Sequence, residues 1–267
     1  MLTINNIELD QTPTTSIAVT WEMEGSQEDF NNYRMSVLRA FAPSSDPAEY
    51  DVLVTGINPA TTYYYLDTDI MTVSDKILNL YYILQISGLL NNEVTYSNAA
   101  TTMYQVTDTH AMEIIRRRQI VFDHHSSTPV FVFVRKKTGT FCPNCYDPVL
   151  QTITTSNCTT CYGTGYVGGY YAPITITGQI NTQPVRETFQ IFGDWQDQDG
   201  VLYMQGFPLL APKDMVYLHD RRWLVQNVGS VAKSEYYIAQ IVHIRQVERL
   251  DITNQVPVYQ DDKGGYY

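Results

Sequence analysis

Positively charged residues are scarce in this chain of 267 residues. Seventeen lysines and arginines stand against 28 aspartates and glutamates, for a formal net charge of −11. General binding to nucleic acid requires basic patches that displace counterions from phosphate, so the composition argues against it. Long apolar runs are missing as well. No stretch of about 18 apolar residues occurs, and we therefore expect no membrane-spanning helix and no membrane partner.

Sequence signatures of catalysis are also missing. The chain contains no HExxH, GxSxG or P-loop pattern, and we predict that it is not an enzyme. The acidic stretch 194–200 ends like a calcium loop, but the distal glutamate of an EF-hand is absent, so we interpret it as a turn. Residues 1–6 have neither the basic nor the apolar region of a secretory leader, which argues against a secreted disulfide scaffold.

Tyrosine, in contrast, is abundant. The chain has 21 tyrosines, and charged residues make up only 17% of it. This balance favours an all-β chain with large contact surfaces. The length favours two domains with a small insert, because single cores of roughly 100 to 150 residues are typical.

The only four cysteines form two CxxC pairs, Cys142 with Cys145 and Cys158 with Cys161. Four thiolates at this spacing can close a tetrahedral Zn²⁺ site. Two disulfides are the alternative, although nothing else in the sequence indicates a secreted scaffold. We predict one structural Zn²⁺, since four thiolates leave no open position for a catalytic water.

Four glycines follow the second pair, within residues 163–169, where the chain must turn with its amides toward sulfur. Residues 158–165 read CxxCxGxG and resemble one repeat of the zinc domain of DnaJ chaperones. The first pair continues as Tyr-Asp-Pro at 146–148 without glycines, and no J-domain precedes it. We interpret the likeness as shared knuckle chemistry and not as chaperone function.

Residues 1–104 alternate short apolar strands with turn signals, the pattern of an antiparallel sandwich. Trp21 ends an alternating strand, Tyr82 lies in a late strand, and residues 63–67 form the strand before the late hairpin. This order resembles an immunoglobulin-like domain of the fibronectin type III class. The resemblance implies a fold and, by itself, no specific function.

Residues 105–137 are expected to form a helical linker followed by a strand. Thr107 or Asp108 is a candidate helix cap, and the apolar strand 129–135 leads into the zinc module at 138–171.

Arg116, Arg117 and Arg118 fall in the later turns of this helix, where positive charge complements the helix dipole. They are candidate partner-binding residues, for phosphate or for an acidic subunit. A solvated helix face is the alternative interpretation.

Residues 172–252 carry repeated hairpins and predict a small closed β-barrel, which has no free strand edges. Residues 253–267 show no periodic pattern and are expected to form a flexible tail. Strands are expected at residues 174–180, 186–192, 200–206, 214–218, 222–228 and 238–247.

Residues 212–225, with an aspartate opening a strand, a tight turn and an aromatic-Val strand, resemble an element of head-closure proteins, which join head to tail in tailed bacteriophages. Residues 241–250 resemble the last strand of that family. A knuckle reading CPxCYDP, followed by CxxCxGTG and a GGYY strand start, is similar to virion structural proteins of large phages. The likeness covers roughly residues 130–252.

The resemblance implies a non-catalytic structural protein of the virion, assembled in the host cytoplasm. Such a protein would form a homo-oligomeric ring, a hexamer or a dodecamer, in the neck of the particle. Its partners would be the portal or adaptor and the tail proteins, with DNA only as passing cargo in the channel. Simple head-closure proteins lack both the sandwich and the zinc module, so a tail or baseplate protein is the alternative. A zinc-dependent DNA-binding regulator is a third hypothesis, disfavoured by the net charge.

Overall fold

The fold is all-β with few short helices, as the sequence predicts. The computed structural model describes residues 2–12, 16–68, 70, 78–90, 93–104, 109–122, 128–181, 199–233 and 236–258. The chain divides into two compact units: residues 1–112 with 137–141, and residues 113–136 with 142–267. Each unit has its own core and is described by itself.

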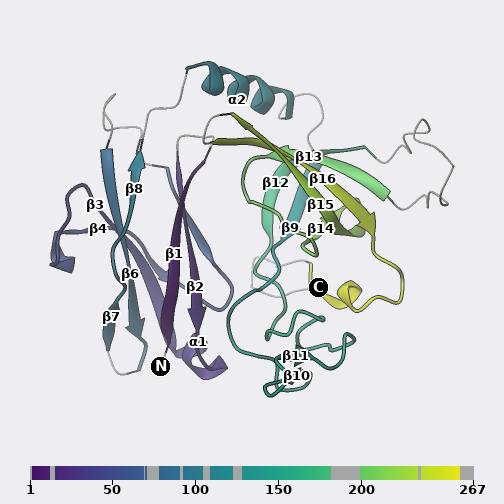
Figure 1. The fold of residues 1–267 in the computed structure, drawn as a ribbon, viewed down its shortest axis with the longest axis horizontal. Coiled ribbons are helices and arrows are strands. Elements are labelled where there is room, and N and C mark those ends of the chain that lie inside the picture. The colour runs from purple at the N-terminus through teal and green to yellow at the C-terminus, as the bar shows by residue number, and fades with distance from the viewer. Residues whose placement is uncertain are drawn as a thin grey trace. The chain divides into compact units, whose positions relative to one another are not determined.

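Short helices are few among the described elements, which Figure 1 labels in chain order. The helices are α1 (Gln27–Asn32) and α2 (Thr109–Val121), with 3₁₀ turns at Pro47–Glu49 and Ile252–Gln255. The strands are β1 (Thr3–Gln11), β2 (Ile17–Glu24), β3 (Tyr33–Ala40), β4 (Asp51–Ile57), β5 (Tyr64–Asp67), β6 (Leu78–Gly88), β7 (Val94–Tyr96), β8 (Ala100–Tyr104), β9 (Thr128–Phe133), β10 (Tyr146–Asp147), β11 (Thr152–Ile153), β12 (Ile174–Asn181), β13 (Asp199–Gln205), β14 (Met215–Leu218), β15 (Arg221–Lys233) and β16 (Tyr236–Gln246).

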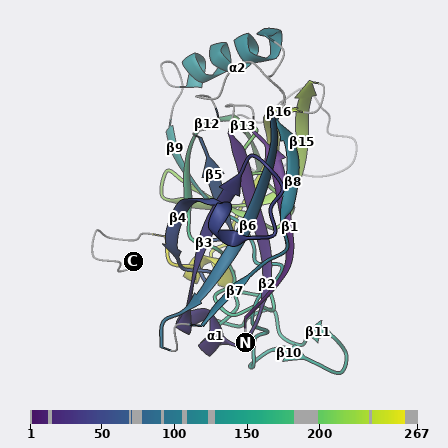
Figure 2. The ribbon, with the colours of Figure 1, turned by 90° about the vertical axis from the view of Figure 1, so that its left-hand side faces the viewer.

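The first unit is a sandwich of two antiparallel sheets. One has the strand order β1-β2-β5, and the other has the order β4-β3-β6-β7, with β8 also paired to β6. Figure 2 looks onto this second sheet, with β3, β4 and β6 toward the viewer. Strands far apart in the sequence are therefore neighbours, as in the sandwich of immunoglobulin-like domains. The predicted sandwich is confirmed.

The two sheets share one apolar core. Alternate residues of β2 and β6 face it, because side chains of a strand point to opposite faces in turn. Trp21 is buried in this core and Tyr82 is fully buried, as their places in the sequence predicted.

A buried ion pair joins the two sheets at one edge of this core. Asp67, at the end of β5, accepts hydrogen bonds from Arg39 Nη1 at 2.6 Å and from the Tyr82 hydroxyl at 2.8 Å. Arg39 and Tyr82 are paired residues of β3 and β6. Burial and the Asp67 carboxylate raise the pKa of Tyr82, which keeps it a neutral donor.

The second unit contains a closed antiparallel barrel of six strands in the order β12-β13-β16-β15-β14-β9 (Figure 1). The sequence predicted the barrel from residue 172 onward. Its sixth strand is β9, which pairs with both β12 and β14 and so closes the ring. Mostly aliphatic side chains fill the interior, among them Val130, Leu202, Val216 and Val242, all 0% exposed.

Two local features hold the barrel connections. The turn between β14 and β15 consists of His219 and Asp220, both with positive φ (49° and 58°), and the Tyr217 hydroxyl donates to Asp220. This geometry matches the right-handed twist of a two-residue hairpin. On β16, the buried Gln240 donates to the carbonyl of Gln205 at the end of β13 and to two carbonyls of the loop that follows, and it accepts from Leu210 N–H.

Part of the predicted tail is folded. Residues 253–258 pack against the outer face of the barrel, where Val256 and Val258 are buried beside Phe133 and Met215. Arg222 Nη2 donates to the Val256 carbonyl at 2.9 Å. The prediction of a flexible segment was wrong for these residues, because a two-valine contact with a distant strand leaves no periodic signal.

Several predicted features lie outside the described residues: the helix cap at Thr107 or Asp108, the strand 186–192, most of the acidic turn 194–200, and residues 259–267 of the tail. Within the described part of the chain, no helix has the length and apolar composition needed to cross a membrane.

Candidate metal centre

The four cysteines form one buried cluster. Their Sγ atoms all lie within 4.8 Å of one another, with Cys142 Sγ 3.6 Å from Cys158 Sγ and Cys145 Sγ 3.1 Å from Cys161 Sγ. All four thiols are free. Sulfur atoms bound at about 2.3 Å around a tetrahedral Zn²⁺ would be about 3.8 Å apart, close to these separations. The geometry thus fits a four-coordinate metal ion.

Backbone N–H groups point at two of the sulfur atoms. Asn144 N–H donates to Cys142, and the N–H groups of Thr160 and Cys161 donate to Cys158. Burial acts to raise the pKa of Cys158, but these N–H groups and the neighbouring thiols outweigh it and lower the pKa to about 6. The side-chain amide of Asn144, through Nδ2, donates to the Thr160 hydroxyl at 2.9 Å and so links the two CxxC turns. At Cys158 the turn therefore favours the thiolate, the form that binds metal.

Two threonines anchor the chain that leaves each pair. Thr154 donates to the Cys145 carbonyl through its N–H at 2.8 Å and its hydroxyl at 3.0 Å. Thr164 donates to the Cys161 carbonyl in the same way, at 3.0 Å and 2.8 Å. Sequence reasoning missed both threonines. Thr164 follows its pair by three residues, whereas Thr154 reaches Cys145 across the β10–β11 hairpin, nine residues later.

The glycines after the second pair adopt backbone conformations that other residues rarely reach. Gly163, Gly165, Gly168 and Gly169 all have positive φ, between 68° and 87°. At Gly169 a Cβ atom would lie only 2.6 Å from the Cys161 carbonyl oxygen. The chain can pass behind this cysteine only without a side chain.

Replacing Gly169 with alanine is therefore expected to weaken metal binding about 10- to 100-fold, because the carbonyl of a ligand residue must move. Gly168→Ala is the matched control. Gly168 also has positive φ, but its nearest obstacle is the flexible Lys136 Nζ at 3.2 Å. The Gly168→Ala variant should lose only about 1–2 kcal/mol of stability and keep the metal affinity of the wild type. Competition with a chromogenic zinc chelator measures both, and equal affinities would contradict this account.

The cysteine segment is an insertion between two neighbouring barrel strands. We call residues 142–171 the metal module; they lie between β9 and β12, and β10 and β11 lie beyond one end of the barrel in Figure 1. Arg135 and Tyr170 form an isolated bridge, and Lys136 N–H donates to the Gly169 carbonyl at 3.0 Å. These bonds extend the β9–β12 pairing into the module.

Two basic side chains that follow β9 reach into the metal module. Arg135 Nη2 donates to the carbonyls of Gly163 and Thr164, each at 3.3 Å, and Lys136 Nζ donates to the Val167 carbonyl at 3.1 Å. Burial lowers the pKa of Lys136 to about 8. Both side chains satisfy backbone carbonyls of the glycine-rich turns.

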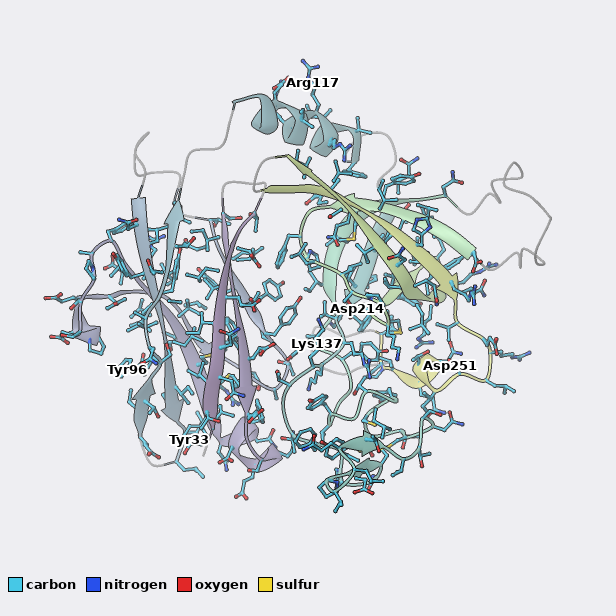
Figure 3. The ribbon with its side chains drawn as sticks, in the orientation of Figure 1. Tyr33, Tyr96, Arg117, Lys137, Asp214 and Asp251 are labelled. Atoms are coloured by element: carbon cyan, nitrogen blue, oxygen red, sulfur yellow. The ribbon has the colours of Figure 1, made fainter. Side chains whose placement is uncertain are left out.

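Asp214 connects this region to the barrel. Its buried carboxylate accepts from Ala211 N–H at 2.7 Å and from Arg135 N–H at 2.8 Å. The sequence placed this aspartate at the start of a strand, and there it holds the local amide of Ala211. The second contact, with Arg135 just after β9, depends on the pairing of β9 with β14 that closes the barrel. Figure 3 labels this residue beside the barrel strands.

The three arginines lie on α2 and do not join the cysteine cluster. Glu113 on the same helix accepts from Arg116 Nε at 3.1 Å and from Arg117 Nε at 2.7 Å. All three arginine side chains are exposed, and Arg117 extends away from the ribbon in Figure 3. Exposed pairs within one helix contribute only about 0.3–0.5 kcal/mol, so they leave the arginines available to a partner.

The donor set determines what the cluster can do chemically. Burial raises the pKa of Cys142 and Cys145, so four adjacent thiolates would need a bound cation to be stable together. Four sulfur ligands suit a metal ion such as zinc.

No known protein-family model matches the chain, and no curated protein matches it either.

Proposed function

We propose that the cluster binds one Zn²⁺ and that this ion is structural. Four cysteine ligands fill a tetrahedral coordination sphere and leave no position for a substrate or a catalytic water. The ion would hold an insertion that has almost no regular structure beyond the short β10–β11 hairpin. For a module of this kind, the free energy of metal binding is the free energy of folding.

The protein as a whole is proposed to be a ring-forming structural component of the neck of a tailed bacteriophage, which extends or seals the DNA channel below the portal. The observation that carries this proposal is the closed six-strand barrel with a four-cysteine insertion between β9 and β12. The barrel spans the segment that resembles head-closure proteins. The local role of Asp214 at the start of β14 also agrees with that resemblance.

Charge supports assembly with like copies. Arg116, Arg117 and Arg118 are exposed in a chain whose net charge is −11, so an acidic neighbour is an electrostatically favourable partner. The acidic balance also suits the wall of a channel through which DNA must slide without adhering.

Electron microscopy of the purified protein, alone and mixed with the portal of its virion, tests the proposal. We expect rings that cap the portal, and we expect charge reversal at the three arginines to reduce their number. Binding to isolated tails and not to the portal would instead support a tail or baseplate protein. Specific retention of duplex DNA at physiological salt, without rings, would support a DNA-binding regulator.

A further inference from the structure

The β10–β11 hairpin of the metal module presents aliphatic side chains to solvent. Val149 is 86% exposed and Leu150 is 67% exposed, in the loop between the two strands. Ile153, on β11, is also exposed. Scattered exposed apolar residues are common on protein surfaces, but two adjacent ones at the tip of a short hairpin are a protruding apolar contact.

This tip has a defined conformation. The Asp147 carboxylate accepts from Val149 N–H at 2.8 Å and from Leu150 N–H at 3.2 Å, which closes the loop from inside. The return strand is tied to the cluster through Thr154 and the Cys145 carbonyl. Binding through a loop that is already ordered costs less conformational entropy than binding through a mobile one.

The metal module has few charged side chains of its own. Outside the cysteine cluster, Asp147 is its only charged residue, and its carboxylate accepts from the loop amides. Two copies of a chain with a net charge of −11 repel each other over most of their surfaces. The metal module is a stretch where a second copy can approach without that repulsion, and depletion of charge is typical of interface cores.

We propose that Val149 and Leu150 are a contact between copies of this chain, in which the hairpin tip of one copy packs against an apolar surface of the next. The inference rests on the proposed ring assembly and identifies one of its interfaces. We assign a second copy to this contact because two acidic chains repel each other elsewhere, whereas this tip has few charged side chains to oppose their approach. The metal then acts indirectly, by holding the tip in place.

Leu150→Asp tests the contact in the full-length, zinc-loaded protein. We expect its self-association constant, measured by sedimentation velocity over a concentration series, to fall about tenfold or more, because a buried apolar contact becomes a desolvated charge. Leu250→Asp is the matched control. Leu250 is 96% exposed and lies outside the metal module, so the same charge change there should leave association unchanged.

Zinc content and the far-ultraviolet circular dichroism spectrum should be the same in the wild type, Leu150→Asp and Leu250→Asp, since both leucine side chains are largely in solvent. Wild-type protein that stays monomeric at every concentration would overturn this inference, whereas rings formed only on the portal would leave the proposed function standing. Equal association of Leu150→Asp and Leu250→Asp would also overturn it. So would binding of the wild type to phosphatidylcholine vesicles that Leu150→Asp abolishes, which would assign the tip to lipid.

Discussion

Cys161→Ser is expected to abolish stoichiometric zinc binding and to unfold the metal module while the barrel strands remain paired. Cys161 is fully buried in the cluster, and a serine hydroxyl does not ionise to replace a thiolate. Metal binding supplies about 10–16 kcal/mol to small zinc-held modules, far more than the β10–β11 hairpin contributes by itself. Elemental analysis measures the zinc, and hydrogen exchange of residues 142–171 measures the unfolding.

Thr159→Ser is the matched control for this substitution. Thr159 is exposed between the two cysteines of the second pair, so a serine at that position should keep the zinc and the protection of the module. Reduced, metal-replete wild-type protein without zinc would contradict the assignment. A mass that corresponds to two disulfide bonds would contradict it as well.

Asp67→Ala is expected to destabilise the sandwich by about 3–5 kcal/mol, because it leaves the charge of a buried arginine without its partner. Asp67 is 1% exposed, and its carboxylate accepts from Arg39 and from Tyr82. The guanidinium cannot lose its proton to relieve the cost. Urea unfolding followed by hydrogen exchange in β3 and β6 measures the change for this unit separately from the barrel.

Asp51→Ala supplies the comparison. Asp51 lies opposite Arg39 in the backbone register of β3 and β4, but its side chain is exposed. Its loss should therefore change stability by no more than about 0.5 kcal/mol. If the two alanine variants unfold at the same urea concentration, the buried pair contributes nothing beyond an ordinary surface contact.

Local features of this protein were predictable because they depend on residues that are close together in the sequence. The spacing of Cys142, Cys145, Cys158 and Cys161 indicated a metal cluster, since two-residue gaps form turns that bring thiols together. The alternation around Trp21 and Tyr82 indicated a sandwich core, because the side-chain period of a strand is two. The glycines at 163–169 indicated turns, and all four have positive φ.

Other features depended on contacts between segments that the sequence separates widely. The apolar strand β9 was predicted as a strand, but its place in the barrel required knowing that its two edges match β12 and β14. Asp67 ends a tyrosine-rich strand, and only the packing of one sheet on the other shows that it neutralises Arg39. Residues 253–258 became ordered because two valines reach the outer face of the barrel. Chain-distant pairing and burial are decided by the closed tertiary structure, whereas turns, periodicity and ligand spacing are decided within a few residues.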